Sequence, residues 1–172
     1  MNTDTAQRIS AAWTVLQSVP DPEVPAISVC ELGIVREVQQ ADDGALEVVL
    51  TPTYSGCPAT EVIERSVLDA LDAAQLGPAR ALTRRHPAWT TDWISDEGRR
   101  KLREYGIAPP GRTTPADTAP IRIVRRQREA SVACPRCDSA QTERLSAFGS
   151  TACKALYRCL ACREPFEHFK PI

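Results

Sequence analysis

The sequence predicts an α+β fold, in which a small N-terminal α+β domain with a mixed sheet is joined by a proline-rich linker to a C-terminal four-cysteine β module. Three observations predict this organisation. Helix and strand patterns alternate in the first part of the chain, several prolines then fall in a stretch with almost no large apolar side chains, and two Cys-x-x-Cys pairs follow. We therefore expect a domain over 1–107, a linker over 108–120 and a module over 121–172.

The first domain is expected to open with a helix and a β-hairpin. Apolar side chains recur every three or four residues over 5–17, as on the buried stripe of an amphipathic helix, and two prolines soon end the pattern. Strand patterns follow at 33–38 and 46–50, with the turn sequence Asp-Asp-Gly between them at 42–44. Two strands joined by so short a turn pair as antiparallel neighbours.

The domain then continues with a helix, a strand and a second helix. Apolar residues with helical spacing run from Val62 to Leu71 and stop at a Gly-Pro pair. A short strand is expected over 81–85. Ser95 is placed to cap a last helix, which ends at Gly106 with two prolines shortly beyond it.

The composition is that of an ordinary soluble protein. Hydrophobic residues make up 42% of the chain and charged residues 25%, which suits a packed core with a solvated surface. The N-terminal sequence has neither a basic start nor a continuous apolar run, so we expect no signal peptide, no membrane contact and a cytoplasmic location. In a reducing compartment, paired cysteines are more typical of metal sites than of disulfides.

Charge is distributed unevenly along the chain. There are 11 basic and 17 acidic residues before residue 120, against 10 basic and 5 acidic residues after it. The segment 121–128 carries four arginines, which suggests a nucleic-acid-binding ribbon as one reading. Such a strand also suits solvent or an acidic partner, and four thiolates around a divalent ion remove about two positive charges. We therefore do not expect nucleic-acid binding.

The strongest functional signal is a set of four cysteines. Cys134 and Cys137 form one Cys-x-x-Cys pair, Cys159 and Cys162 form another, and 21 residues separate the two pairs. Each pair directs two thiolates at one point, so both together supply a tetrahedral metal site, and so short a module needs the ion in order to fold. We predict a structural zinc in a zinc-ribbon-like module, with a single iron ion or an iron-sulfur cluster as the alternative.

Two other residues of this module are not assigned to the metal. Cys153 lies beside Lys154 and is expected to be a small packed side chain, with a reactive thiol as the alternative. His168 lies on a strand pattern between two phenylalanines, which favours a position behind the ligands or facing solvent over direct coordination.

Cys57 lies between the second predicted strand and the helix that follows it. Gly56 before it permits an unusual backbone, and Pro58 after it suits the first position of a helix. Amides at the start of that helix are expected to lower the pKa of the Cys57 thiol, and a thiolate can bind a soft metal, accept a cluster or act as a nucleophile. A buried helix cap is an equal alternative. Neither His86 nor His168 has a recognisable relation to Cys57, so hydrolytic catalysis is weakly supported.

Six motifs together resemble a known family. They are Asp21-Pro-Glu-Val-Pro25, Glu31-Leu-Gly-Ile-Val35, Thr51-Pro-Thr-Tyr-Ser-Gly-Cys-Pro58, Ala88-Trp-Thr-Thr-Asp-Trp93, Phe148-Gly-Ser-Thr-Ala-Cys-Lys-Ala155 and Glu164-Pro-Phe-Glu-His-Phe-Lys170. The first three look like the motifs of the small α+β domain shared by iron-sulfur assembly factors. With the other three, the chain resembles the D subunits of bacterial phenylacetyl-CoA epoxidase systems over nearly its whole length.

The resemblance implies an accessory protein rather than an enzyme. In that family the epoxidation belongs to a separate di-iron oxygenase subunit, which is fed by a reductase subunit with flavin and a plant-type iron-sulfur cluster. This sequence has neither a carboxylate-and-histidine helix pattern for a di-iron site nor a glycine-rich dinucleotide motif. The implied function is a maturation factor that helps insert iron or an iron-sulfur cluster into the oxygenase or the reductase in phenylacetate catabolism.

Two groups of residues carry this implied function. Cys57 matches the cysteine that iron-sulfur assembly factors are thought to use for transient contact with iron or a cluster. The C-terminal cysteines match the metal site of the epoxidase D subunits. The alternative is a non-catalytic structural or regulatory subunit that bridges epoxidase components. Which component is the client, which cluster is involved and whether the chain forms a homodimer stay open.

Overall fold

The computed structural model describes residues 3–54, 56–111 and 132–171. The chain forms two compact units, Met1–Gly98 and Arg99–Ile172. None of the described helices combines the length and the hydrophobicity that crossing a bilayer requires. The basic segment 121–128 and most of the expected linker at 108–120 lie outside the described residues.

The N-terminal unit is built on a three-stranded sheet. Its strands are β1 (Val35–Gln40), β2 (Leu46–Leu50) and β3 (Ala79–Thr83), in the order β1-β2-β3. β1 and β2 are antiparallel, and β3 lies parallel to β2 on its other side. The predicted hairpin and the mixed sheet are therefore confirmed.

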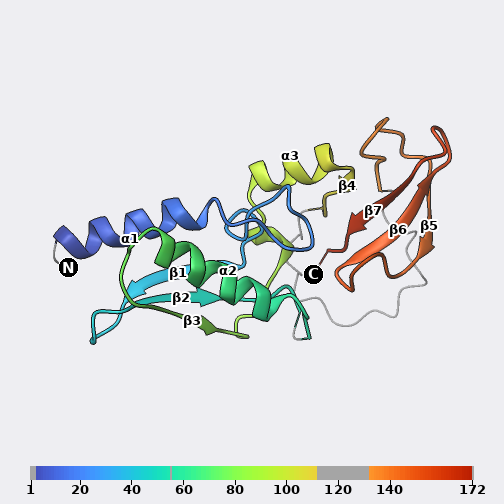
Figure 1. Cartoon of the computed structure of the whole chain (residues 1–172). Coiled ribbons are helices and arrows are strands. Elements are labelled where there is room, and N and C mark those ends of the chain that lie inside the picture. The colour runs from blue at the N-terminus through green and yellow to red at the C-terminus, as the bar shows by residue number, and fades with distance from the viewer. Residues whose placement is uncertain (1–2, 55, 112–131, 172) are drawn as a thin grey trace, which may run out of the picture. The chain divides into compact units, whose positions relative to one another are not determined.

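Two helices pack against this sheet and against each other. They are α1 (Thr3–Leu16), which contacts β1, and α2 (Thr60–Ala73), which contacts β3 (Figure 1). Apolar residues spaced by four on a helix and by two on a strand share one face, so α2 and β2 both have a face to bury. The buried residues of these two faces are Ile63, Val67, Leu71, Leu46, Val48 and Leu50.

Three connecting segments meet at one end of this sheet. Because β2 and β3 are parallel and β1 runs against them, the chain before β1 lies at the same end as the chain after β2 and after β3. The amide of Thr51 donates to the carbonyl of Ile34, and the amide of Arg84 donates to the carbonyl of Leu50, each over 2.8 Å. The loop that carries Cys57 begins at this end.

The segment after β3 is fixed on the loop before β1. The indole nitrogen of Trp89, a buried side chain, donates to the carbonyl of Leu32 over 3.1 Å. Gly33 has a φ of 76°, and a Cβ added there would lie 2.7 Å from the Cβ of Trp93. Only glycine accommodates both this left-handed backbone and the close approach.

Helix α3 (Asp96–Tyr105) contains the division between the two units. Its start is capped as predicted, because the hydroxyl of Ser95 accepts a hydrogen bond from the amide of Gly98 over 2.9 Å. Strand β4 (Ile107–Ala108) follows the helix and pairs in parallel with β7 of the C-terminal unit. The division therefore falls earlier in the chain than residue 107, since β4 is a strand of the second sheet.

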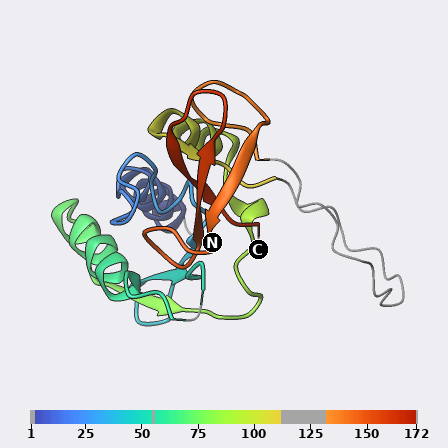
Figure 2. The same ribbon diagram turned by 90° about the vertical axis from the view of Figure 1, so that its right-hand side faces the viewer.

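The C-terminal unit is a four-stranded sheet in the order β4-β7-β6-β5. Its longer strands, β5 (Thr142–Ser146), β6 (Lys154–Cys159) and β7 (Pro165–Phe169), are antiparallel and lie side by side (Figure 1; Figure 2). A small apolar core packs on one face and includes two of the predicted metal ligands. Its members are Ala108, Cys134, Ala155, Tyr157, Cys159 and Phe166, with Val132 packed against them.

Candidate metal centre and cysteine loop

The four predicted ligand cysteines come together in the C-terminal unit. Their sulfur atoms all lie within 4.8 Å of one another, and no other group of three or more His, Cys, Asp and Glu side chains in the described ranges is arranged to hold a metal ion. The Sγ atoms of Cys134 and Cys162 are 3.8 Å apart, and those of Cys137 and Cys159 are 3.6 Å apart. Four thiolates at about 2.3 Å from one zinc ion stand about 3.8 Å from each other in a tetrahedron. The spacing therefore fits a tetrahedral thiolate site.

Each cysteine pair lies on a turn of the same design. In both pairs the amide of the first cysteine donates over 3.0 Å to the carbonyl five residues later. The residue that follows each pair has a left-handed backbone, with a φ of 59° at Asp138 and of 68° at Arg163. These repeated features turn the chain back on itself, so that both thiols of a pair face the same point.

The backbone of the second turn favours a thiolate at Cys159. The amide of Cys162 lies 3.5 Å from the Sγ of Cys159, and this hydrogen bond is the leading cause that lowers the pKa of Cys159 to about 6. The backbone of Glu164 lowers the pKa of Cys162, but burial and the three neighbouring thiols outweigh it and raise that pKa to about 12. Cys134 and Cys159 are buried, whereas Cys137 and Cys162 are exposed. Four protein ligands that complete a tetrahedron leave no open position for a substrate, which is the arrangement of a structural site.

His168 and Cys153 do not join this ligand set. His168 is 8% exposed on β7, and its ring lies edge-on to that of Tyr157 with 5.5 Å between the centroids. Burial lowers the pKa of His168 to about 4, so the ring is neutral, and the reading in which it faces solvent is wrong. Cys153 is buried, with its Sγ 3.0 Å from the hydroxyl of Thr151, which confirms a packed side chain.

Cys57 lies in the loop between β2 and α2 and is half-buried. Its amide donates to the carbonyl of Tyr54 over 3.2 Å, and its carbonyl accepts from the hydroxyl of Thr60 over 2.9 Å. Helix α2 begins at Thr60, so Pro58 stands before the helix and not at its first position. The loop therefore holds the backbone of Cys57 in place just ahead of the helix.

The amide effect predicted for Cys57 is present, but the pKa of its thiol is raised and not lowered. Partial burial raises the pKa of this thiol and is the largest effect, and the negative charge of Glu23 raises it further. A hydrogen bond from the backbone of Ala59 acts in the opposite direction without outweighing burial. Cys57 is therefore a neutral thiol near neutral pH.

Sequence reasoning missed two features. Cys30, in the loop before β1, is half-buried, and burial followed by the charge of Glu31 raises its pKa to about 12. Lys154 is only 2% exposed, and its Nζ lies 3.0 Å from the Oε2 of Glu167. The only signal for the second was a lysine at the head of a strand pattern, and surface strands often begin in the same way.

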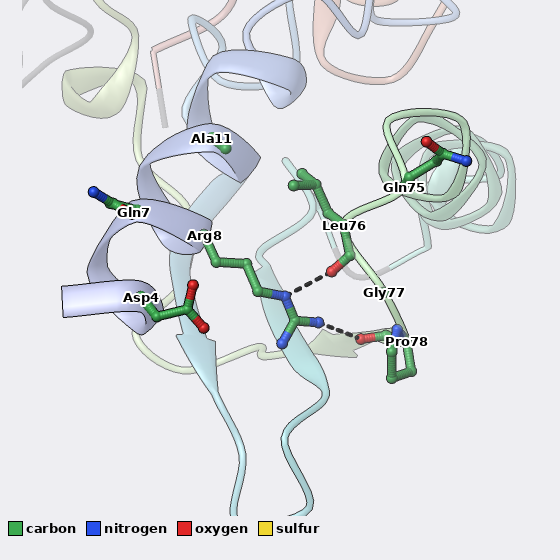
Figure 3. A pocket seen from close by; sticks show the side chains of 8 residues that line it. All are labelled: Asp4, Gln7, Arg8, Ala11, Gln75, Leu76, Gly77 and Pro78. Carbon is green, nitrogen blue, oxygen red and sulfur yellow. Dashed lines mark hydrogen bonds between the residues drawn. The ribbon is translucent and has the colours of Figure 1, made fainter. Parts of the chain in front are cut away.

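An open pocket of about 570 Å³ lies between the start of α1 and the turn before β3. Figure 3 shows Arg8 reaching across it, where its guanidinium donates to the carbonyls of Leu76 over 2.6 Å and Pro78 over 3.4 Å. A third bond, to the carbonyl of Gly44, measures 2.7 Å. Because the guanidinium already donates to these backbone carbonyls, we assign Arg8 a structural role in the fold.

Fold and site together define a class of protein, an iron-sulfur-assembly-type domain joined to a zinc β ribbon. Residues 9–79 match the family model described as an iron-sulfur cluster assembly protein. Residues 118–170 match the PaaD zinc beta ribbon domain. The second match includes all four clustered cysteines.

Similar proteins extend this likeness to the whole chain. A protein of Escherichia coli (strain K12), whose name gives it as a candidate D subunit of 1,2-phenylacetyl-CoA epoxidase, is 45% identical over 166 residues, which is 96% of this chain and 94% of that one. The chain therefore belongs to the family of phenylacetyl-CoA epoxidase D subunits.

Two further comparisons concern the N-terminal part. An Fe-S protein maturation auxiliary factor of Porphyromonas gingivalis (strain ATCC BAA-308 / W83) is 31% identical over 104 residues, 59% of this chain and 97% of that one. A crystal structure of a DUF59 domain from Bacillus anthracis superposes with a TM-score of 0.53 at 21% identity and covers 58% of this chain and 94% of that one. The second likeness supports the fold alone.

Proposed function

We propose that this chain is an accessory maturation factor of a multicomponent phenylacetyl-CoA epoxidase. In this role it assists the insertion of iron or an iron-sulfur cluster into the oxygenase or the reductase component and performs no epoxidation itself. The observation that carries the proposal is a half-buried thiol, Cys57, on a loop of an iron-sulfur-assembly-type domain, separate from the four-cysteine cluster. The names of the relatives, one an epoxidase component and the other a maturation factor, support it.

In this proposal the four-cysteine cluster holds a permanent structural zinc. The sulfur spacing fits zinc, and the closed ligand set suits a scaffold better than a site that must release its metal. When bound, the ion supplies a charge that keeps all four thiols deprotonated and joins the two turns. Cys134 and Cys137 hold it from one turn, and Cys159 and Cys162 hold it from the other.

Cys57, in contrast, offers one sulfur ligand to iron or an iron-sulfur cluster that binds only transiently, the cargo of the factor. Among the residues that the structure describes, it is not part of any group of three potential ligands, so the other ligands of the cargo come from elsewhere, such as the client. On transfer, the bond from iron to the Cys57 sulfur breaks as a bond to a client thiol forms. The proton released by the client thiol then passes to Cys57, whose raised pKa favours this direction.

The experiment is replacement of Cys57→Ser in cells that express the complete epoxidase system. We expect a folded, zinc-containing protein together with client components that lack iron or cluster and have lost epoxidation activity. Cys30→Ser is the matched control, because Cys30 is also a half-buried thiol of the N-terminal unit, and it should leave the client active. Full client activity in the Cys57→Ser strain would contradict the proposed role of Cys57.

A second candidate function is a structural subunit that bridges epoxidase components. The charge of the two units favours it, because Met1–Gly98 has six basic and 15 acidic residues and Arg99–Ile172 has 15 basic and seven acidic residues. Surfaces of opposite charge suit two different partners. In that case Cys57→Ser would be harmless, and the client metal content would stay normal.

A further inference from the structure

The loop between β5 and β6 presents an aromatic side chain to solvent. Phe148 is 64% exposed, more than any other large apolar side chain among the described residues. Leu145, at the end of β5, is 49% exposed and lies at an irregularity of the pairing between β5 and β6. A bulge at such a position redirects a side chain away from the sheet. Aromatic residues are enriched in protein–protein interfaces, so Phe148 is a candidate contact for a partner protein.

The backbone that carries Phe148 is fixed by hydrogen bonds. The amide of Phe148 donates to the hydroxyl of Ser146 over 3.1 Å. The next amide, of Gly149, donates to the carbonyl of Lys154 over 2.8 Å. The loop is thus tied at both ends to the strands that it connects, and Phe148 is held outward from a defined position.

An ion pair between a buried lysine and a partly buried glutamate supports the same loop. The carboxylate of Glu167 accepts from the amide of Ser150 and pairs with the almost fully buried Nζ of Lys154 at 3.0 Å. Gly149 lies so close that an added Cβ would collide with the Oε1 of Glu167. Burial of the lysine charge is costly unless the charge is paired. The paired carboxylate also binds the backbone of the loop that presents Phe148.

The surroundings of Phe148 are basic. The Nζ of Lys170 lies 4.5 Å from the centre of the Phe148 ring and donates to the carbonyl of Ala147 over 3.3 Å. Among its described residues, the C-terminal unit has 10 basic and five acidic side chains, and a thiolate-bound zinc ion removes about two of these positive charges. Attraction between opposite charges therefore favours an acidic partner.

We propose that Phe148 and Leu145, with Lys170 beside Phe148, form a docking surface for an acidic face of a partner protein, in which Phe148 enters an apolar pocket. Aromatic side chains are enriched at interfaces, and an anchor that is already held in place loses little conformational freedom on binding. A nucleic acid would stack its bases on the ring, but Lys170 already lies over one ring face, and Leu145 adds an aliphatic contact that suits a protein pocket. The inference rests on the proposed function, because the partner is taken to be an epoxidase component.

The test measures binding of the full-length, metal-loaded chain to the separately purified oxygenase and reductase components of its own epoxidase system. We expect Phe148→Ala to weaken binding to one component by about 30-fold, as truncation of an interface hot spot does. Gly149→Ala alters no exposed side chain but displaces the loop, and it should weaken the same binding about tenfold or more. Binding should also weaken as the salt concentration rises.

Tyr105→Ala is the matched control, since Tyr105 is another exposed aromatic residue of the C-terminal unit, at 56%. It should bind as the wild type does. A photoreactive benzoylphenylalanine in place of Phe148 should crosslink to the partner component, and one in place of Tyr105 should not. The crosslink keeps the proposal testable even where Gly149→Ala folds poorly.

Several results would overturn the docking surface. They are unchanged binding of Phe148→Ala, no binding of the wild type to either component, loss of self-association alone in Phe148→Ala, and binding of duplex DNA or single-stranded RNA that depends on Phe148. A failure of the proposed function would give a different result from a failure of the docking surface. If only the proposed function fails, Cys57→Ser would leave client maturation intact, while the Phe148 and Gly149 variants would still weaken binding.

Discussion

At the scale of single residues, Cys57 joins partial exposure to a high proton affinity. A raised pKa keeps the free thiol protonated near neutral pH, which protects it from oxidation because the thiolate is the reactive form. The same basicity makes the thiolate a strong ligand once a metal has displaced the proton. In the proposed maturation function, this property suits a resting state without cargo and a loaded state with one metal bond.

This property predicts the pH dependence of alkylation. We expect the rate of Cys57 modification by iodoacetamide in the native protein to be low at pH 7 and to rise through an apparent pKa above that of an ordinary cysteine thiol, because the thiolate fraction sets the rate. Mass spectrometry of the labelled peptide over a range of pH gives the profile. Cys57→Ser assigns the signal, and an apparent pKa at or below that of an ordinary cysteine thiol would contradict the effect of burial.

His168 predicts how stability changes with pH. Its pKa is about 4 in the folded chain and about 6.5 in an unfolded one, so the unfolded state binds the extra proton between these values. The free energy of unfolding is therefore fully retained above pH 6.5 and falls as the pH drops toward 4. Urea unfolding at pH 7.5 and pH 5 should show a larger loss for the wild type than for His168→Gln. Equal losses would mean that protonation of the thiolates accounts for the whole effect.

At the scale of elements, Arg8 connects α1 to two turns distant in sequence. Its guanidinium donates to the carbonyls of Gly44 in the turn between β1 and β2 and of Leu76 and Pro78 between α2 and β3. One side chain thereby fixes the helix to both turns. A stripe of apolar residues positions a helix on a sheet, but such bonds to carbonyls define where along the sheet it lies.

We expect Arg8→Ala to lower the free energy of unfolding by about 1 to 3 kcal/mol, because three carbonyls lose a charged donor and must find water instead. Arg8→Lys should cost less, since an ammonium replaces part of the bonding. Thermal unfolding followed by tryptophan fluorescence measures both. Arg65→Ala on the exposed face of α2 is the control and should change stability by no more than about 0.5 kcal/mol. A loss of stability in Arg65→Ala as large as that in Arg8→Ala would contradict the role given to Arg8.

Elements with a strong periodic pattern were predictable from sequence, and those formed by tertiary contacts were not. The strand over 46–50 has the expected bounds, because its run of β-branched and apolar residues begins just after the turn. Strand β4, only Ile107–Ala108, could not be predicted, since two residues carry no period and pair only because β7 lies beside them. The prediction for the pKa of Cys57 failed for the same reason. Sequence places it before a helix, but burial and the charge of Glu23 come from the folded loop.

The candidate metal centre was predictable as a ligand set because spacing within each Cys-x-x-Cys pair is local. The ion pair that supports the loop of Phe148 was not predictable. Buried Lys154 pairs with partly buried Glu167 and joins β6 to β7, whereas the sequence shows only two basic residues and one acidic residue in the two strands. To identify this ion pair from sequence, one would need to know which faces of β6 and β7 are covered. That coverage depends on the loop that carries Phe148.

At the scale of the whole molecule, the two units differ in what stabilises them. Met1–Gly98 buries a core between a sheet and two helices, whereas Arg99–Ile172 has a small apolar core next to the cysteine cluster. A core of that size depends on its ion, because metal binding and folding are coupled in small modules. Removal of the metal should therefore act on one unit only.

All three tryptophans, at positions 13, 89 and 93, belong to the N-terminal unit, so their fluorescence reports that unit alone. We expect a strong thiol-competing chelator to abolish the dispersed NMR signals of β5, β6 and β7 while the tryptophan emission and its thermal midpoint change little. Cys134→Ser should reproduce this result without chelator, because three thiolates leave the tetrahedron incomplete. A red-shifted tryptophan emission on metal removal would instead mean that the two units unfold as one. In that case the zinc ribbon would stabilise the domain that carries Cys57, and loss of maturation in a cluster-ligand variant could no longer be assigned to the C-terminal unit.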